Sequence, residues 1–161
     1  MALTSSLVET SGPNAITVHA SAVAYKDCGL LITGDPGSGK TALAVEMMAL
    51  GAGLVADDWV AIERGRGGGL VMNAPKPIAG LVELRGIGLI RLPYIDQAPL
   101  AFVVDLNTAT RERLPEHTRR RLLGQEYPVI AGRDRPGLPA ALFAVLRAGT
   151  LLEPDFFTDL T

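Results

Sequence analysis

Short runs of apolar residues, each ended by glycine, proline or polar residues, dominate the hydropathy pattern of the chain. Apolar and β-branched runs between such turns are typical of buried strands. We therefore expect strands over residues 15–25, 30–33, 54–56, 59–63, 70–73, 89–92, 101–106 and 127–130. Because only the turn Lys26-Asp27-Cys28-Gly29 separates the first two strands, they should form an antiparallel hairpin.

Three further segments have the character of helices. Residues 40–50 carry Glu46 as their only charge after Lys40 and stop at Gly51, which is typical of a buried helix ended by glycine. Residues 139–148 form a second apolar helix, and residues 115–124 a short Arg-rich one. Many short strands with few helices predict an α/β protein built on a mixed, partly antiparallel sheet.

The length of the chain limits its domain organisation. With 161 residues, of which 48% are hydrophobic, the chain is long enough for one domain with its own core. We expect residues 15–150 to form this domain. A flexible N-terminus over residues 1–14 and an acidic tail over residues 151–161 should flank it.

Charge and cysteine usage exclude several classes of protein. Fifteen basic and 17 acidic residues give a net charge of −2, so there is no basic field to attract nucleic acid. The single cysteine, Cys28, excludes an internal disulfide framework and a cysteine-based zinc site. The chain shows neither a secretory signal nor an apolar run long enough for a membrane helix. A cytoplasmic protein without nucleic-acid or membrane partners is expected.

Residues 34–41 match the phosphate-loop (P-loop) pattern Gly-x-x-x-x-Gly-Lys-[Ser/Thr] between a predicted strand and a predicted helix. The glycines allow backbone N–H groups to face phosphates, Lys40 reaches the β- and γ-phosphates, and Thr41 can ligate Mg²⁺. The expected nucleotide-binding residues are Gly34, Asp35, Pro36, Gly37, Ser38, Gly39, Lys40 and Thr41. The alternative is a glycine-rich turn with an ordinary surface lysine.

Acidic residues provide candidates for metal binding and proton transfer. Asp57 and Asp58 end an apolar strand directly after the first helix, where phosphate-loop enzymes hold their metal. Adjacent strand residues face opposite sides, so the two carboxylates need not share one role. Glu83 and Arg85 lie on one face of an extended segment and could hold Mg²⁺ and a phosphoryl group. The alternatives are a simple Asp-Asp turn and a surface ion pair.

Histidine and arginine residues give weaker signals. A lone histidine within a strand, such as His19, is more often structural than catalytic. The arginine run is either a solvated helix face or a docking patch for an anionic partner, and its members are Arg111, Arg113, Arg119, Arg120 and Arg121.

Taken together, His19 and residues 34–41, 54–58 and 83–88 resemble the catalytic domain of the HPr kinase/phosphorylase family, in a short form without the usual additional N-terminal domain. The resemblance implies a fold similar to that of phosphoenolpyruvate carboxykinase. It also implies a Mg-ATP-dependent protein serine kinase that phosphorylates the phosphocarrier protein HPr and regulates a phosphotransferase system. Reversal by phosphorolysis and assembly into hexamers are further properties that the family resemblance suggests.

The resemblance also implies roles for single residues. Lys40 would hold the nucleotide phosphates, and Thr41 and Glu83 would ligate Mg²⁺. Asp58 would take the serine proton, supported by Asp57 and His19, and the catalytic residues would be Asp58, Lys40, His19, Asp57 and Arg113. The sequence departs from the family pattern at Pro115, where glycine is usual, and at two positions of residues 128–133, the segment tied to the reverse reaction.

Two other classes of function stay open at this point. The first is a small-molecule kinase or nucleotide hydrolase, but only residues 111–121 could supply the mobile arginine-bearing lid that a small-molecule kinase usually has. The second is a non-catalytic nucleotide-sensing protein, against which the intact Asp57, Asp58 and Glu83 argue.

Overall fold

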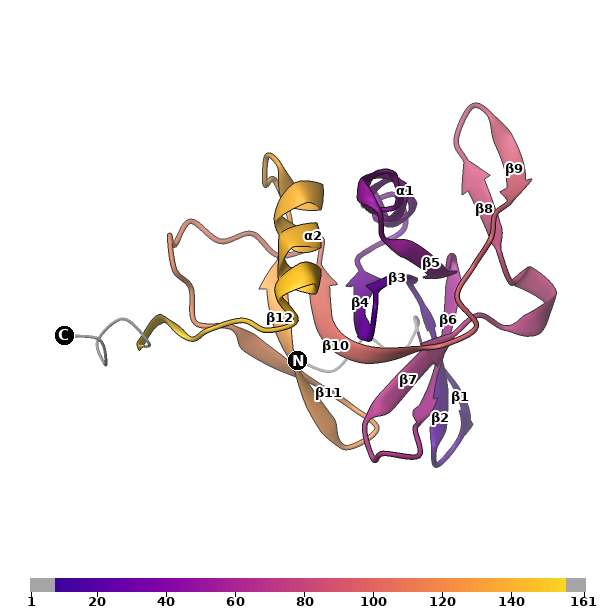
Figure 1. The fold of residues 1–161 in the computed structure, drawn as a ribbon, viewed down its shortest axis with the longest axis horizontal. Helices are drawn as coiled ribbons and strands as arrows, with labels where there is room; N and C mark the ends of the chain where they lie inside the picture. The colour runs from indigo at the N-terminus through magenta and orange to yellow at the C-terminus, as the bar shows by residue number, and fades with distance from the viewer. Residues whose placement is uncertain (1–7, 156–161) are drawn as a thin grey trace.

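The computed structural model describes residues 8–155 and is built in three layers (Figure 1). One mixed sheet bends back on itself through strand β10, so that its two halves pack face to face, and both helices cover the outer face of one half. The elements are β1 (Val8–Gly12), β2 (Ala15–His19), β3 (Ser21–Tyr25), β4 (Cys28–Thr33), α1 (Lys40–Leu50), β5 (Gly53–Ala56), β6 (Trp59–Arg64), β7 (Leu70–Asn73), a 3-10 turn (Lys76–Ile78), β8 (Leu81–Leu84), β9 (Gly88–Arg91), β10 (Ala98–Asp105), β11 (Thr118–Leu122), β12 (Gln125–Ala131) and α2 (Leu138–Ala148).

The half of the sheet under the helices contains the parallel strands. β10 runs parallel to β4 on one side and to β12 on the other, while β3 and β5 add antiparallel strands beyond β4. The register pairs Asp105 with both Thr33 and Ala131, so the carboxyl ends of three strands meet at one edge. Ligands of open α/β sheets bind at such an edge. The mixed, partly antiparallel sheet predicted from the sequence is confirmed.

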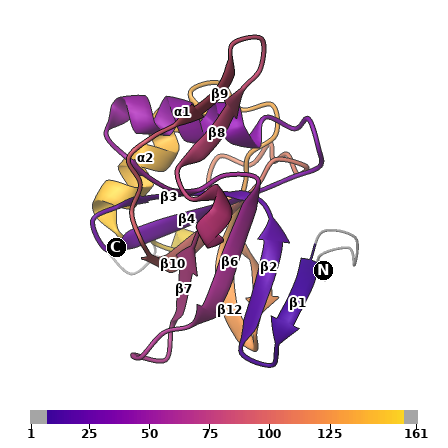
Figure 2. The same ribbon diagram turned by 90° about the vertical axis from the view of Figure 1, so that its right-hand side faces the viewer.

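The other half of the sheet is antiparallel. Its order is β1, β2, β6 and β7, followed by the first residues of β10, where Ala98 pairs with Met72. Figure 2 shows these strands crossing the direction of β3 and β4. Alternate side chains from both halves, such as Val18, Ile62, Leu31 and Val103, fill the space between them and are fully buried.

The helices end where the sequence predicts. α1 spans Lys40–Leu50 and stops at Gly51, and α2 spans Leu138–Ala148. Leu138, Leu142 and Leu146 recur at every fourth position of α2 and pack with Met47 of α1 over the parallel strands. In the part of the chain that is described, neither helix has the length and apolar character that a membrane crossing needs.

The strand expected over residues 15–25 is wrong as a single element. It breaks at Ala20 into β2 and β3, which lie in different halves of the sheet. Ala20 is fully buried, and its N–H leaves the ladder to bond the carbonyl of Asp58 at 3.2 Å. The hairpin predicted across Lys26 is confirmed for β3 and β4. Neither proline nor glycine interrupts residues 15–25, so the sequence gives no turn signal for such a change of sheet.

The Arg-rich helix expected over residues 115–124 is also wrong. Residues 118–122 form β11, which pairs with β12 through a two-residue turn at Leu123 and Gly124. Both turn residues have positive φ, 46° and 78°, which is the type I′ geometry that matches the twist of a hairpin. The arginines therefore alternate between the two faces of a strand.

The chain ends differ in part from the expected flexible segments. Over Val8–Gly12 the expected flexible N-terminus is instead strand β1, paired with β2. Residues 151–155, the first part of the expected tail, follow α2 and carry a short 3-10 turn. Residues 1–7 and 156–161 lie outside the described residues.

Gly29 lies where β10 passes from one half of the sheet to the other, and its lack of a side chain permits that passage. A Cβ atom at this position would overlap the carbonyl oxygen of Pro99 and come within 2.7 Å of Met72 Cε. We expect Gly29→Ala to lower the free energy of unfolding by about 1–3 kcal/mol through overpacking, as measured by urea denaturation. The matched control is Gly67→Ala, where an added Cβ meets no atom within 4 Å. Equal stability of the two variants would contradict this view of the crossing.

Candidate active site

A cavity of about 760 Å³ opens between the loop of residues 34–41, the start of α1 and the β8–β9 hairpin. The volume lies within the range of small-molecule sites, roughly 300–1,000 Å³. Figure 1 shows the hairpin standing away from the main sheet, beside α1. The predicted residues that line the cavity are His19, Pro36, Gly37, Gly39, Lys40, Thr41, Asp57, Asp58 and Glu83.

The loop of residues 34–41 has a backbone that depends on glycine. Gly37 and Gly39 have φ values of 81° and 96°, in the left-handed region where residues with a Cβ are rare. The Ser38 N–H donates to the carbonyl of Asp35 at 3.0 Å, which closes the turn before α1 begins at Lys40. The first N–H groups of a helix have no acceptor within it, so this end of α1 presents donors toward the cavity.

Lys40 folds back over the loop. Its Nζ donates to the carbonyl oxygens of Gly34 at 2.9 Å and Asp35 at 3.0 Å, and the side chain is almost fully buried. Burial lowers the pKa of the Lys40 ammonium, an effect that the neighbouring Asp58 carboxylate opposes in part. An ammonium has three donors, and two are used here. The third donor of the partly desolvated Lys40 ammonium could therefore form a hydrogen bond with an anion bound in the loop.

Asp57 lies at the base of the cavity, 5% exposed. Its Oδ1 accepts a hydrogen bond from Ser21 Oγ at 2.6 Å, and the Thr41 hydroxyl lies 3.0 and 3.1 Å from its two oxygens. Burying a carboxylate is costly unless donors such as these bond to it. The contacts join β3, α1 and the turn between β5 and β6. Sequence reasoning missed Ser21, although it is a small polar residue at the start of a strand otherwise made of Ala, Val and Tyr.

Asp58 is turned outward by a strained backbone. Its φ is 70°, and the Trp59 N–H donates to the Asp57 carbonyl at 2.9 Å, which closes a three-residue turn centred on Asp58. Turns of this kind with positive φ are rare and strained. The side chain of Asp58 is 68% exposed. The neighbouring carboxylates therefore have different surroundings, through a tight turn rather than through strand alternation.

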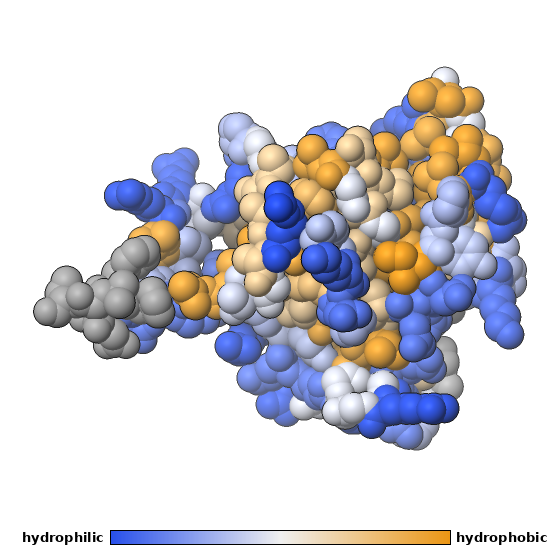
Figure 3. All heavy atoms as spheres, viewed as in Figure 1, coloured by the Kyte–Doolittle hydropathy of each residue, from blue (hydrophilic) through white to orange (hydrophobic). Residues whose placement is uncertain are grey.

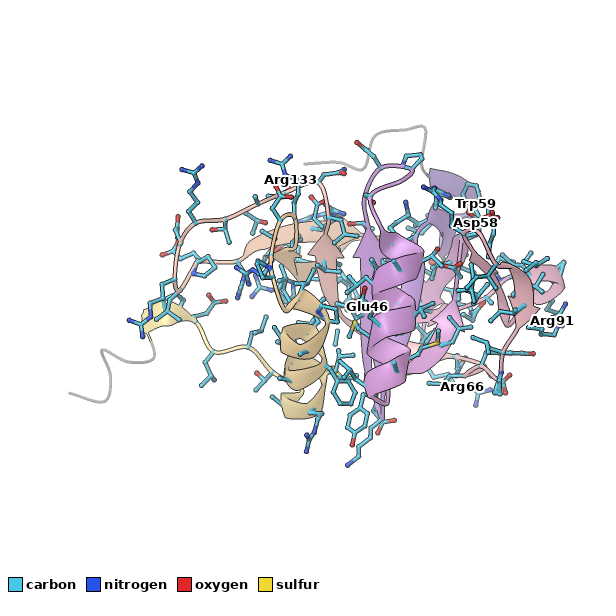
Figure 4. All side chains as sticks on the ribbon, turned by 90° about the horizontal axis from the view of Figure 1, so that it is seen from above. Glu46, Asp58, Trp59, Arg66, Arg91 and Arg133 are labelled. Atoms are coloured by element: carbon cyan, nitrogen blue, oxygen red, sulfur yellow. The ribbon has the colours of Figure 1, made fainter. Side chains whose placement is uncertain are left out.

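His19 contacts Asp58 directly. Its Nε2 lies 2.9 Å from Asp58 Oδ1, and its ring meets the Trp59 ring edge-on with centroids 5.3 Å apart. Figure 4 shows Asp58 and Trp59 together on one side of α1. Two side chains that sequence reasoning selected separately, from positions 39 residues apart, thus form one pair at the cavity wall.

The β8–β9 hairpin contributes the outer wall of the cavity. Glu83 and Arg85 are exposed and line it, which places Glu83 in the same cavity as Thr41. Ile87, in the turn, and Leu89, in β9, are 80% and 66% exposed, and Figure 3 shows hydrophobic atoms at this far end of the molecule. The cavity is therefore lined by both polar and apolar side chains, and exposed apolar residues lie on its hairpin wall.

The structure does not bring Arg113 to this cavity. Arg113 is exposed on the segment between β10 and β11 and is not among the residues that line the cavity. Residues 128–133, the segment that resembles the reverse-reaction loop, end β12 and continue beyond it. Arg133 lies on the opposite side of α1 from Asp58 (Figure 4). The described contacts therefore leave both segments apart from the His19–Asp58 pair.

Comparison with known proteins agrees with the sequence resemblance. The family model described as HPr Serine kinase C-terminal domain matches residues 13–113. The chain belongs to this family. The HPr kinase/phosphorylase of Geobacillus sp. (strain WCH70) is 41% identical over 164 residues, which cover 89% of this chain and 53% of that protein. That of Bordetella pertussis is 37% identical over 110 residues, which cover 62% of this chain and 36% of that protein.

A solved structure shares the fold. The Hpr(Ser) kinase/phosphatase from Coxiella burnetii superimposes with a TM-score of 0.70 at 24% identity, covering 82% of this chain and 88% of that chain. The curated relatives are longer than this chain, and the chain spans about half of their length or less.

Two serines in the site offer a matched test of its hydrogen bonding. Ser21 Oγ donates to buried Asp57, whereas Ser38 Oγ is buried without a partner among the described residues. We expect Ser21→Ala to lower the free energy of unfolding by about 1.5–3 kcal/mol, because the carboxylate loses a donor. Ser38→Ala should change it by less than about 0.5 kcal/mol or raise it, since no bond is lost. Urea denaturation without ligand would measure both, and an equal loss would contradict the role given to Ser21.

Proposed function

We propose that the chain is a Mg-ATP-dependent protein serine kinase that acts on an HPr-like phosphocarrier protein, and so regulates a phosphotransferase system. Family membership supports the kinase class. The observation that carries the proposal is the contact between His19 and Asp58, 2.9 Å long, in a cavity that also contains Lys40 and Thr41. A carboxylate beside a phosphate-binding loop is the arrangement that phosphoryl transfer to a hydroxyl requires.

The loop of residues 34–41 would bind the nucleotide phosphates. Its glycines and the N-terminus of α1 supply backbone donors, and Lys40 supplies the charge. Ser38 Oγ, buried without a partner among the described residues, is a further donor that an anion would satisfy. Lys40 would exchange a hydrogen bond to a loop carbonyl for one to a phosphate oxygen. The partly desolvated ammonium would then have an anionic partner.

The residues at the cavity base fit Mg²⁺. Thr41 and Asp57 offer hydroxyl and carboxylate oxygens side by side, and Glu83 adds a carboxylate on the hairpin wall. Mg²⁺ usually takes one or two protein carboxylates and completes its shell with water and phosphates. When bound, Mg²⁺ would neutralise phosphate charge.

Asp58 would act as the general base. It is exposed at the cavity wall, so the hydroxyl of a protein serine could donate to its carboxylate, and Nε2 of His19 would hold that carboxylate in place. Asp58 would take the hydroxyl proton as the serine oxygen forms its bond to the γ-phosphorus and the bond to the β-phosphate oxygen breaks. In the phosphorolytic direction an oxygen of inorganic phosphate would form the new bond to the phosphoserine phosphorus. The bond to the serine oxygen would break, and the same carboxyl would return the proton to that oxygen.

We expect Asp58→Asn to keep Mg-ATP affinity within about twofold but to lower the rate of phosphoryl transfer by about 10²–10⁴-fold, because the base is lost. Asparagine tolerates the left-handed backbone, so the turn should persist. Mass spectrometry of an HPr-like protein incubated with Mg-ATP would measure phosphoserine formation. Asp134→Asn is the matched control, since Asp134 also has positive φ, 56°, but is 85% exposed outside the cavity. Undiminished transfer by Asp58→Asn would contradict the proposal.

Lys40→Ala should weaken ATP binding by roughly 10–100-fold, the effect of losing a charge-assisted hydrogen bond to phosphate. Isothermal titration calorimetry with ATP in the presence of Mg²⁺ would measure the affinity. Lys26→Ala is the control, because Lys26 lies in the turn at the opposite end of β4. If Lys40→Ala bound ATP as tightly as the unsubstituted protein, the phosphate-binding role of the loop would be wrong.

A further inference from the structure

Polar residues follow the carboxyl ends of β4 and β10, which pair in parallel with Thr33 opposite Asp105. The loop of residues 34–41 leaves β4 at this edge, and a short turn of residues 106–108 leaves β10 beside it. The Leu106 N–H donates to the Thr33 carbonyl at 2.9 Å, so the two chain segments stay together past the ends of their strands.

Asn107 forms two hydrogen bonds with Asp35 of the loop. The Asp35 backbone N–H donates to Asn107 Oδ1 at 3.0 Å, and Asn107 Nδ2 donates to Asp35 Oδ1 at 3.2 Å. The carbonyl of Asp35 in turn accepts the Ser38 N–H and one proton of Lys40 Nζ. Asn107 therefore fixes the residue on which the turn of the loop and the resting position of Lys40 both depend.

Asp105 holds Asn107 in place. One of its carboxylate oxygens accepts the Asn107 backbone N–H at 2.9 Å, and the other accepts the Thr108 hydroxyl at 2.8 Å. The Asp105 carbonyl also accepts the Gly132 N–H at 2.9 Å, which ties the turn to the end of β12. These contacts fix the turn that carries Asn107 to the ends of β10 and β12, so the position of its side-chain amide is set by the sheet.

Arg120 completes the support from β11. Its NH2 lies 3.4 Å from Asp105 Oδ2, and its NH1 donates at 3.0 Å to Thr33 Oγ1, directly before the loop. The Arg120 side chain is 13% exposed, whereas the neighbouring Arg121 is 70% exposed, as the alternation of a strand requires. Arg120 therefore links the last residues of β4 and β10, and its positive charge lies beside the Asp105 carboxylate.

We infer that Asn107 is a positioning residue for phosphate binding, supported by Asp105 and Arg120. The inference rests on the proposed function, because it assigns Asn107 an effect on the affinity of residues 34–41 for nucleotide. Asn107 touches neither reacting group: its effect is to hold the loop in one conformation before the ligand arrives. A loop ordered in advance loses less conformational freedom on binding, and this raises affinity.

The neutrality of Asn107 also matters. Asn107 lies between the carboxylates of Asp35 and Asp105, and it accepts from the backbone of one while donating to both. A third carboxylate at this position could still accept the Asp35 N–H but would repel its neighbours. An amide is therefore the side chain that this position needs.

The first experiment measures Mg-ATP affinity of the full chain by calorimetry and the melting temperature without ligand. Asn107→Ala should raise the dissociation constant about tenfold, the effect of two lost hydrogen bonds. The melting temperature without ligand should fall by no more than about 2 °C, because the Asn107–Asp35 contact is exposed. Asn73→Ala is the control, since Asn73 is an amide on β7 that contacts Glu63. Unchanged affinity in Asn107→Ala would overturn the inference, as would a large loss of melting temperature that accounts for the weaker binding.

The second experiment is a reciprocal exchange in a double-mutant cycle. Asn107→Asp alone should weaken Mg-ATP binding by more than Asn107→Ala does, because it adds repulsion against Asp35. Combining it with Asp35→Asn again places one amide donor opposite one carboxylate acceptor. The double variant should bind Mg-ATP at least fivefold more tightly than the product of the two single effects predicts. Strictly multiplicative effects would overturn the inference. Failure of the unsubstituted chain to bind Mg-ATP would contradict the proposed function itself, whereas the outcomes above concern Asn107 alone.

Discussion

The buried carboxylate of Asp57 is the interaction on which the arrangement of the site depends. A charge almost out of contact with water must be met by donors, and those donors come from β3 and α1. Satisfying Asp57 therefore sets the distance between the strand that carries Ser21 and the helix that carries Thr41. The next residue, Asp58, has none of these donors and is exposed.

The outward turn of Asp58 follows from this constraint. A backbone that must return at once to β6 has to bend within three residues, and it does so through a left-handed conformation that aspartate rarely adopts. The strain is held by neighbours: the Asp58 carbonyl accepts from Ala20, and its carboxylate meets His19. The break between β2 and β3 and the exposed carboxylate are two results of one local geometry.

Sequence patterns predicted the parts of this protein that depend on neighbours along the chain. The glycines of residues 34–41, the apolar run of α1 and the Asp57–Asp58 pair each carry a local signal. No local signal gives the contacts of Ser21 and Arg120, because both contacts depend on strands that come together across the sheet. The Arg-rich segment shows the reason most clearly. Its helix prediction is wrong because a tight turn and the pairing with β12, not local preference, determine its conformation.

The contact between Asp35 and Asn107 joins residues 72 positions apart. During synthesis at about 5–20 residues per second, the motif of residues 34–41 would emerge roughly 4–14 s before its partner exists. In that interval the glycine-rich segment has its residues but lacks the contact with Asn107 that fixes its conformation. Parallel pairing of β10 with β4, itself a long-range step, must come before the loop is fixed. If the loop binds phosphate as proposed, a nascent or shortened chain that lacks β10 would carry the motif without the conformation that binding needs.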